Sequence, residues 1–316
     1  MRKIKSKNIT FGYKCNNNCI HCLIGYDAKK QFKDRTTEEI KERLKEAKEE
    51  KVEKVIFIGG EVTIRDDFFE LLEYAKKLNL RVHIETNGRM FSIDSFARKT
   101  LEIMPDLDLM MSFHSSVPEI QDRITQVKCS WVQSVRGIKN LKKYGLKNLA
   151  IDCVITKFNY KNLEENVKFF KKLGVDELHF TLMRIGGNAQ KNLDKVFVPI
   201  KEIQPYLFKA IEIGEKLGIN VRTYGFPYCT IKGYEEHAYE IDFIKTFLEG
   251  KTYVFDELTE EIDWQKERIS IKTKLKSCRE CAYFHICEGI WREYIKLGVT
   301  LKPIRNEDNL IKILEK

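Results

Sequence analysis

Short β-rich runs alternate with longer amphipathic segments from residue 8 to about residue 200. Branched and aromatic residues predict strands over 9–13, 54–58, 81–85, 107–113, 148–156 and 177–182. Apolar residues at helical spacing predict helices over 37–50, 67–78, 92–103, 132–144 and 163–173. Repeated strand and helix units imply parallel strands joined by right-handed crossovers. The expected fold is α/β, a partial (β/α)6 TIM-like barrel that is open on one side, with its chemistry at the C-terminal ends of the strands.

The pattern changes after Pro199. A long helix is predicted over 201–217, then a short run at 220–223 and a mixed region that carries several cysteines. We therefore expect a core domain at 1–200 and a small C-terminal domain at 201–316. The second part is too irregular to bury much core of its own, so a bound metal cluster would supply what packing cannot.

Composition narrows the function classes. No apolar run approaches the roughly 18 residues that span a bilayer, and the N-terminus lacks the apolar core of a signal peptide, so a cytoplasmic location is expected. The formal charge is +9, but the lysines lie among glutamates on amphipathic helices, which favours solvated helix faces over a nucleic-acid surface. In a reducing compartment, the nine cysteines are better explained as metal ligands than as disulfides.

Three of those cysteines lie in one loop directly after the first predicted strand. Cys15, Cys19 and Cys22 form the segment CNNNCIHC, whose asparagines tolerate the turns needed to bring the sulfurs together. An iron–sulfur cluster usually takes four thiolates, so three would leave one iron free for an external ligand. The alternative is a structural zinc site completed by His21, although its place between the last two cysteines makes ligation awkward.

Further motifs follow the next three predicted strands. Gly59, Gly60 and Glu61 follow the second strand, Thr86, Asn87 and Gly88 follow the third, and Ser112 ends the fourth. With the cysteine loop, these motifs resemble the radical S-adenosylmethionine (SAM) superfamily, in the expected order and over about 180 residues. Each motif falls where a strand end of the barrel would place it.

This resemblance implies the cofactors and the reaction. Cys15, Cys19 and Cys22 would hold a 4Fe-4S cluster whose free iron binds SAM, and an electron from the cluster would give a 5′-deoxyadenosyl radical that removes hydrogen from the substrate. The cofactor-binding residues implied for SAM are Gly59, Gly60, Glu61, Thr86, Asn87 and Ser112. His21 stands where the family usually has an aromatic residue against the adenine.

A second group of cysteines lies near the C-terminus. Cys278, Cys281 and Cys287 fall within ten residues, and structural zinc is the ordinary interpretation of a CxxC pair. Here the spacing resembles part of the SPASM extension of radical SAM enzymes, in its shortened, twitch-like form. The resemblance implies one auxiliary 4Fe-4S cluster, with Cys229 as fourth ligand. The alternative is that Cys229 is free, as a hydrogen-atom donor, and that the auxiliary cluster keeps an open iron.

Two further residues are candidates for catalysis. Asp152 alternates with Cys153 on the fifth predicted strand, and we expect Asp152 to point into the barrel, with a buried structural carboxylate as the alternative. Cys129 follows the fourth strand in a loop near the barrel mouth and could approach the substrate. A non-catalytic role for Cys129 is the competing interpretation, because a reactive thiol needs an identifiable environment.

The substrate is the least constrained part of the prediction. The segment SFHSSVPEIQDRIT and the twitch-like tail resemble enzymes that modify ribosomally made peptides by crosslinks, thioethers or epimerisation. Only fourteen residues precede Cys15, so no leader-binding domain is expected. Without such a domain, a small-molecule substrate is the alternative, namely a sugar, nucleotide or cofactor precursor.

Partners and other function classes complete the prediction. Such an enzyme needs an electron donor such as ferredoxin or flavodoxin. A non-catalytic electron carrier would need the cysteines but not the GGE and TNG motifs. A zinc-stabilised nucleic-acid binder would contain zinc and no iron.

Overall fold

The fold was analysed in a computed structural model, which describes residues 3–305. Its strands are β1 (Lys3–Thr10), β2 (Lys54–Ile58), β3 (Val82–Thr86), β4 (Asp108–Ser112), β5 (Asn148–Ile155), β6 (Glu177–Leu182), β7 (Asn220–Tyr224), β8 (Lys251–Asp256), β9 (Glu261–Asp263), β10 (Lys272–Thr273) and β11 (Ile290–Trp291). A nine-stranded sheet has the order β7-β6-β5-β4-β3-β2-β1-β8-β9, and only the β8–β9 pair in it is antiparallel. Strands β1 to β7 thus lie side by side in chain order.

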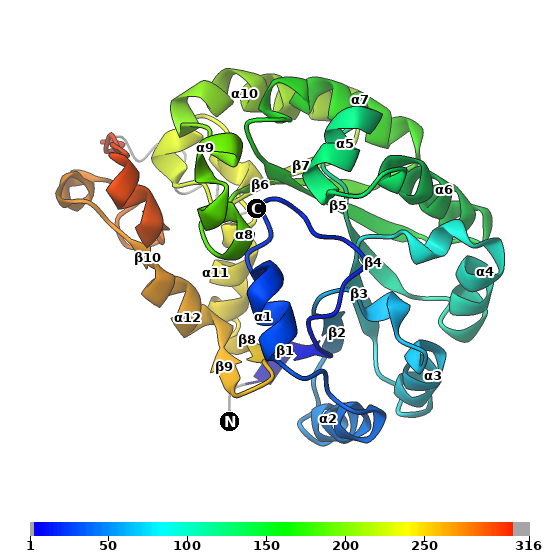
Figure 1. Ribbon diagram of the computed structural model, residues 1–316. Helices are drawn as coiled ribbons and strands as arrows, with labels where there is room; N and C mark the ends of the chain where they lie inside the picture. Colours follow the sequence, from blue (N-terminus) through cyan, green and yellow to red (C-terminus); the bar gives the residue numbers. More distant parts are fainter. Residues whose placement is uncertain (1–2, 306–316) are drawn as a thin grey trace.

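The helices of the described residues join the strands, and several of them cover the outer face of the sheet. They are α1 (Gly25–Gln31), α2 (Thr37–Glu49), α3 (Phe68–Lys77), α4 (Asp94–Ile103), α5 (Pro118–Thr125), α6 (Ser130–Lys143), α7 (Leu163–Lys172), α8 (Gly187–Lys191), α9 (Leu193–Val196), α10 (Ile200–Leu217), α11 (Glu240–Leu248) and α12 (Trp264–Ile271). Figure 1 shows α2, α3, α4, α6, α7 and α10 as an outer arc around the curved sheet. The expected α/β partial barrel is confirmed. Within residues 3–305, no helix is long and apolar enough to cross a membrane.

Local sequence explains where these elements form. In β5, Leu149, Ile151 and Ile155 are buried and alternate with partly exposed residues, which is the pattern of a strand between a helical layer and a barrel interior. Helix α2 begins at a capping box in which Thr36 and Glu39 satisfy each other's backbone amides, so the chain turns into the helix directly after the cysteine loop and α1.

The sheet is wider than the six strands expected from the sequence. Strand β7 extends it beyond β6, and β8 pairs in parallel with β1 at the other side, so segments after residue 200 complete the barrel wall. The short strands β10 and β11 form a separate antiparallel pair next to the C-terminal cysteines. In Figure 1 this last part, orange to red, lies outside the helical arc. The division into two domains near residue 200 stays a prediction.

The loops that follow β1 and β2 are in direct backbone contact. The amide of Gly60 donates to the carbonyl of Gly12 at 2.8 Å, and the amide of Glu61 donates to the carbonyl of Lys14 at 2.8 Å. A Cβ atom on Gly60 would lie 2.1 Å from the Lys14 carbonyl oxygen, and one on Gly59 would lie 2.2 Å from that of Gly12. Both glycines are therefore needed for the β2 loop to reach the start of the cysteine loop.

We predict that Gly60→Ala destabilises the fold by about 2–4 kcal/mol, because the new methyl group meets backbone atoms that cannot rotate away. Urea unfolding of both proteins measures the difference. Gly218→Ala is the matched control, since Gly218 ends α10 with a φ of 63° and no atom lies within 4 Å of its Cβ position. That control should lose only about 1 kcal/mol, the conformational cost alone. Equal losses in the two variants would contradict the steric explanation.

Candidate active site

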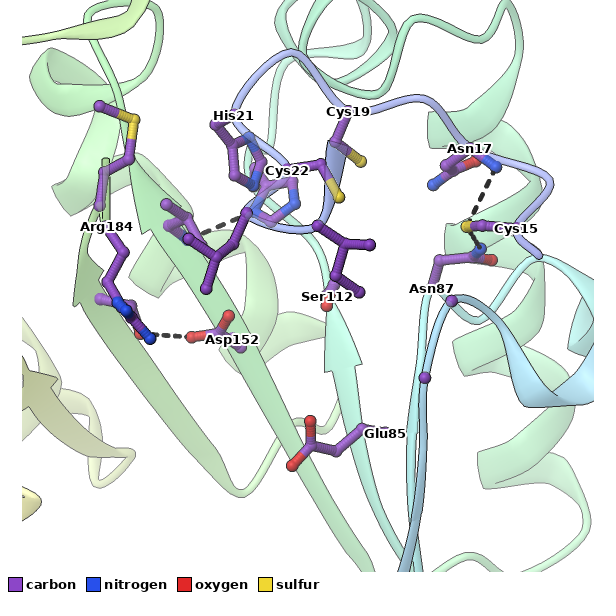
Figure 2. Close-up of a pocket in the computed structure, with 18 of the residues that line it drawn as sticks. Cys15, Asn17, Cys19, His21, Cys22, Glu85, Asn87, Ser112, Asp152 and Arg184 are labelled. Carbon is purple, nitrogen blue, oxygen red and sulfur yellow. Dashed lines mark hydrogen bonds between the residues drawn. The ribbon is translucent and has the colours of Figure 1, made fainter. Parts of the chain in front are cut away.

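A cavity of about 320 Å³ lies at the C-terminal ends of the barrel strands. Most residues predicted for the site line it: Cys15, Cys19, His21, Cys22, Gly59, Gly60, Thr86, Asn87, Ser112 and Asp152. Figure 2 shows the three cysteines in the loop above the strands, with Asp152 and Ser112 on the strands below. Glu61 and Cys129 are not among the residues that line it.

The cysteine loop is held in place by contacts from three neighbouring elements. Arg89 donates to the carbonyl of Asn16 at 2.6 Å and to the side chain of Asn17 at 2.8 Å. The Asn87 amide donates to the Asn16 side chain at 2.7 Å, and the Ile20 amide donates to the carbonyl of Ile124 at the end of α5. These contacts fix the loop, so the protein's own hydrogen bonds position the thiols.

The chemistry of the three thiols suits an iron–sulfur cluster. The Cys15 sulfur accepts hydrogen bonds from the Asn17 amide at 3.3 Å and the Asn87 side chain at 3.9 Å, an arrangement that stabilises cluster thiolates. Burial, followed by the neighbouring thiols, raises the pKa of Cys19 to about 12. A bound metal supplies the positive charge that removes such a proton. Within residues 3–305, no three acidic, His or Cys side chains are grouped as ligands of a single ion. In a cluster, each thiolate binds a different iron.

Glu61 links the ends of β2 and β3. Its carboxylate accepts hydrogen bonds from the hydroxyl of Thr63 at 2.5 Å, the hydroxyl of Thr86 at 2.6 Å and the amide of Asn87 at 2.6 Å. The side chain is buried, and burial raises its pKa despite these bonds. Glu61 thus holds the TNG segment in place. Direct binding of SAM by its carboxylate stays a prediction.

Two histidines form the roof of the cavity beside the cysteines. The rings of His21 and His114 meet edge to face, with centroids 4.6 Å apart, and Nδ1 of His114 accepts from the amide of Val154. Burial lowers the pKa of His21 to about 4, and it lowers the pKa of His114 well below the usual range. Both rings are therefore neutral near pH 7, and a neutral ring of this kind can stack on a base such as adenine.

Asp152 and Glu85 place two carboxylates on the cavity wall, from β5 and β3. Asp152 accepts a hydrogen bond from the hydroxyl of Thr181, and burial raises its pKa. Glu85 lies on the barrel wall, where its side chain is exposed to the cavity. Its enclosed position, followed by the negative charge of Asp152, raises its pKa to about 7. Asp152 points inward as expected from the alternation along β5.

Cys129 lies away from this cavity. It is exposed at the start of α6 with a φ of 63°, and its amide donates to the carboxylate of Asp122 at 2.6 Å. The residue thus takes part in the start of a surface helix. A catalytic role for it stays a prediction.

The second set of cysteines converges. Cys229, Cys278, Cys281 and Cys287 line one small cavity of about 20 Å³. The Cys281 sulfur accepts from the amide of Ile304 and the Cys287 sulfur from that of Gly289, each at 3.4 Å. Burial and the other three thiols raise the pKa of Cys229 to about 12. Four thiols with amide donors are a suitable ligand set for a second cluster.

The motif-bearing strand ends and the three thiols together match a known family. The sequence model of the Radical SAM superfamily matches residues 9–173, which is half of the chain. The chain belongs to the radical SAM superfamily. It is therefore an enzyme of the family that uses a 4Fe-4S cluster with SAM.

The relatives of this radical SAM enzyme include a maturase and a probable cyclase. Mycofactocin maturase MftC of Mycolicibacterium smegmatis is 29% identical over 196 residues, which cover 62% of this chain and 48% of that protein. The "Probable GTP 3′,8-cyclase" of Sulfurisphaera tokodaii is 31% identical over 180 residues, covering 56% of each. The chain spans about half the length of the curated relatives that it matches.

Solved structures confirm the radical SAM fold. SuiB of Streptococcus suis bound to S-adenosylmethionine superposes with a TM-score of 0.61 at 17% identity, covering 96% of this chain and 76% of that one. The anSMEcpe protein with bound AdoMet gives 0.65 at 18% identity, covering 98% and 96%. At these identities the likeness concerns the fold alone.

Several residues of the cavity were not predicted from the sequence. They are Lys29, Glu85, His114, Thr181, Arg184, Tyr224 and Trp291. Glu85 directly precedes the TNG segment, and Arg184 follows the end of β6, so the strand-end rule could have identified both. Trp291 comes from the C-terminal part, and its approach to the barrel has no local signal.

We predict that Glu85→Gln stabilises the enzyme more at pH 8 than at pH 5. The raised pKa means that folded Glu85 keeps a proton that the unfolded chain releases above its ordinary pKa of 4.5, so stability is lost as the pH rises from 4.5 to about 7 and the loss is complete above that. Asp152 raises this pKa, and Lys54 lowers it. Differential scanning calorimetry at the two pH values measures the shift in Tm. A shift that is the same at both would argue against the raised pKa.

Proposed function

We propose that this radical SAM enzyme removes a hydrogen atom from a peptide substrate held in the cavity. The observation that carries the proposal is the convergence of Cys15, Cys19 and Cys22 with the GGE, TNG and Ser112 segments on one cavity, which continues to Asp152 and Trp291. Peptides are favoured because the related proteins include a maturase, and because neighbours in fold were solved with a precursor peptide and with a Kp18Cys peptide.

The chain's own residues would bind and orient the reactants. When bound, the cluster and SAM supply a 5′-deoxyadenosyl radical, formed with methionine by one-electron reduction of SAM, which takes one hydrogen atom from the substrate. The backbone of Gly59 and Gly60, with Thr86, Asn87 and Ser112, would hold SAM against the open iron position. The neutral rings of His21 and His114 would cover its adenine and exclude water. Asp152 would face the substrate.

The four C-terminal cysteines would hold one auxiliary 4Fe-4S cluster. Held by four thiolates, it would supply electron transfer rather than a binding site for substrate. Trp291 lines the main cavity and lies four residues after Cys287 in the sequence. Reduction of SAM requires an outside donor, for which a ferredoxin or flavodoxin in the cytoplasm is suitable.

A small-molecule substrate is the second candidate. The observation in its favour is the GTP 3′,8-cyclase relative, which is 31% identical over 180 residues. Anaerobic incubation with SAM and a reductant distinguishes the two. Short peptides encoded beside the gene, deuterated at candidate carbons, should pass deuterium to 5′-deoxyadenosine, as mass spectrometry detects. Transfer from a nucleotide and from no peptide would favour the second candidate.

We predict that replacing Cys15, Cys19 and Cys22 by Ala abolishes 5′-deoxyadenosine formation, because the open iron position is lost. Liquid chromatography of the reaction measures the product, and circular dichroism checks the fold. Cys153→Ala is the matched control, since Cys153 is buried in the core and does not line the cavity. Undiminished cleavage of SAM in the triple variant would contradict the proposal.

The auxiliary cluster predicts a defined iron content. The triple variant should retain about four irons per chain, the content of one remaining 4Fe-4S cluster. Adding Cys229→Ala should lower that content or change the Mössbauer spectrum, because one iron loses its thiolate. If content and spectrum stayed the same, Cys229 would be a free thiol beside a cluster held by the other three cysteines.

A further inference from the structure

Arg184 is a cation in the active-site cavity that the proposed reaction leaves without a role. We propose that Arg184 is the anion-binding residue of the substrate site and that it takes a carboxylate of the substrate. The inference rests on the proposed function, because it assumes that substrate enters this cavity. It adds a ligand class, which neither the family nor the relatives specify.

Arg184 lies opposite the cluster loop. It follows β6 by two residues and lines the cavity from the side where the C-terminal part meets the barrel. Figure 2 shows it across the cavity from Cys15 and Asn87, the residues next to the SAM motifs. A group bound by Arg184 would therefore lie beyond SAM, where the substrate is expected.

The guanidinium of Arg184 has no polar partner within residues 3–305. No hydrogen bond or ion pair joins it to another described residue, and its Nε is buried with no acceptor. A guanidinium carries five N–H donors and stays charged at all ordinary pH values. Arg184 is partly buried and its Nε has no acceptor in the protein, so the arrangement suits an anion that arrives from outside.

A nearby lysine is a cation whose charge is balanced by carboxylates. Lys272 is buried, and its ammonium contacts Glu240 at 3.1 Å and Glu288 at 2.6 Å. Both Lys272 and Arg184 lie over the ring of Trp291, at 4.4 Å and 5.2 Å from its centroid. Lys272 thus has two carboxylates, whereas Arg184 has the aromatic ring alone. Of these two cations, Arg184 is the one that is available to a ligand.

Trp291 orients the guanidinium. The indole is fully buried and cannot move aside, so the stacked guanidinium has fewer orientations open to it than a free arginine. A planar, preoriented fork suits the two oxygens of a carboxylate. A phosphate dianion is less suitable, since the carboxylate of Asp152 lines the same cavity and would repel its greater charge. In a peptide, the carboxylate belongs either to the C-terminus or to an acidic side chain.

Titration calorimetry on the anaerobically reconstituted holoenzyme, with SAM and without reductant, tests the proposal. The probes are an N-acetyl dipeptide acid, its C-terminal amide, a dipeptide amide that contains glutamate, and inorganic phosphate. The variants are Arg184→Gln and Arg184→Lys. Arg98→Gln is the matched control, since Arg98 lies exposed on α4 beside Glu102.

We expect at least one carboxylate probe to bind the parent and Arg98→Gln alike, and to bind Arg184→Gln about tenfold more weakly or worse. The lysine variant should be intermediate, because it keeps the charge and loses the fork. Binding of the acid but not of its amide assigns the C-terminal carboxylate, and binding of the glutamate probe assigns a side chain. If Arg184→Gln does not fold, the comparison of acid and amide on the lysine variant carries the test.

Other results would overturn the proposal. They are equal binding of the acid and its amide together with no binding of the glutamate probe, an unchanged affinity in Arg184→Gln, tighter binding of phosphate, or no binding of any carboxylate to the parent. A tenfold loss of SAM affinity in Arg184→Gln would assign the residue to the cofactor instead. These measurements need no turnover. If carboxylates bind at Arg184 while no peptide donates hydrogen to 5′-deoxyadenosine, the peptide assignment fails and the anion site stands.

Discussion

The active site depends on the backbone contact between the loops after β1 and β2. Gly60 and Gly59 let the β2 loop lie directly against Gly12 and Lys14, at distances that any side chain would prevent. Glu61 then extends the contact to β3, because its buried carboxylate accepts from Thr86 and Asn87. Three strand ends are thereby fixed relative to one another before any cofactor binds. The buried carboxylate of Glu61 therefore has a structural role, because it joins these strand ends even though burial opposes its ionisation.

The sequence predicted the barrel well because its signals are local. The expected strands 54–58 and 177–182 coincide with β2 (Lys54–Ile58) and β6 (Glu177–Leu182), and helix 37–50 differs from α2 by a single residue. The extra width of the sheet was not predictable in this way. Strand β8 pairs with β1 across more than 240 residues of sequence, and parallel pairing at that separation leaves no periodic signal in either segment.

The site was predicted to the extent that its residues follow strand ends in recognisable motifs. The cysteine loop, Gly59 and Ser112 all line the cavity as expected, and Cys229 lies with the C-terminal cysteines. Glu85 and Arg184 were missed although they lie beside predicted strand ends, because a charged residue there has no motif to distinguish it from a solvated one. The exposed position of Cys129 depends on how α6 begins, which the loop sequence does not specify.

The wall between the cavity and the auxiliary cysteines contains a buried ionic network. Lys272 contacts Glu240 and Glu288, and Arg268 contacts Glu288 at 2.7 Å, with all four side chains largely enclosed. Such networks add little net stability, because desolvation offsets most of the attraction between the charges. Their geometry is nevertheless demanding, since a displaced partner leaves an unpaired charge. Glu288 directly follows Cys287 in the sequence, and Lys272 on β10 lies opposite Trp291 on β11 in the antiparallel pair. We infer that the network sets the position of the C-terminal cysteines, and of the indole that supports Arg184, relative to the barrel.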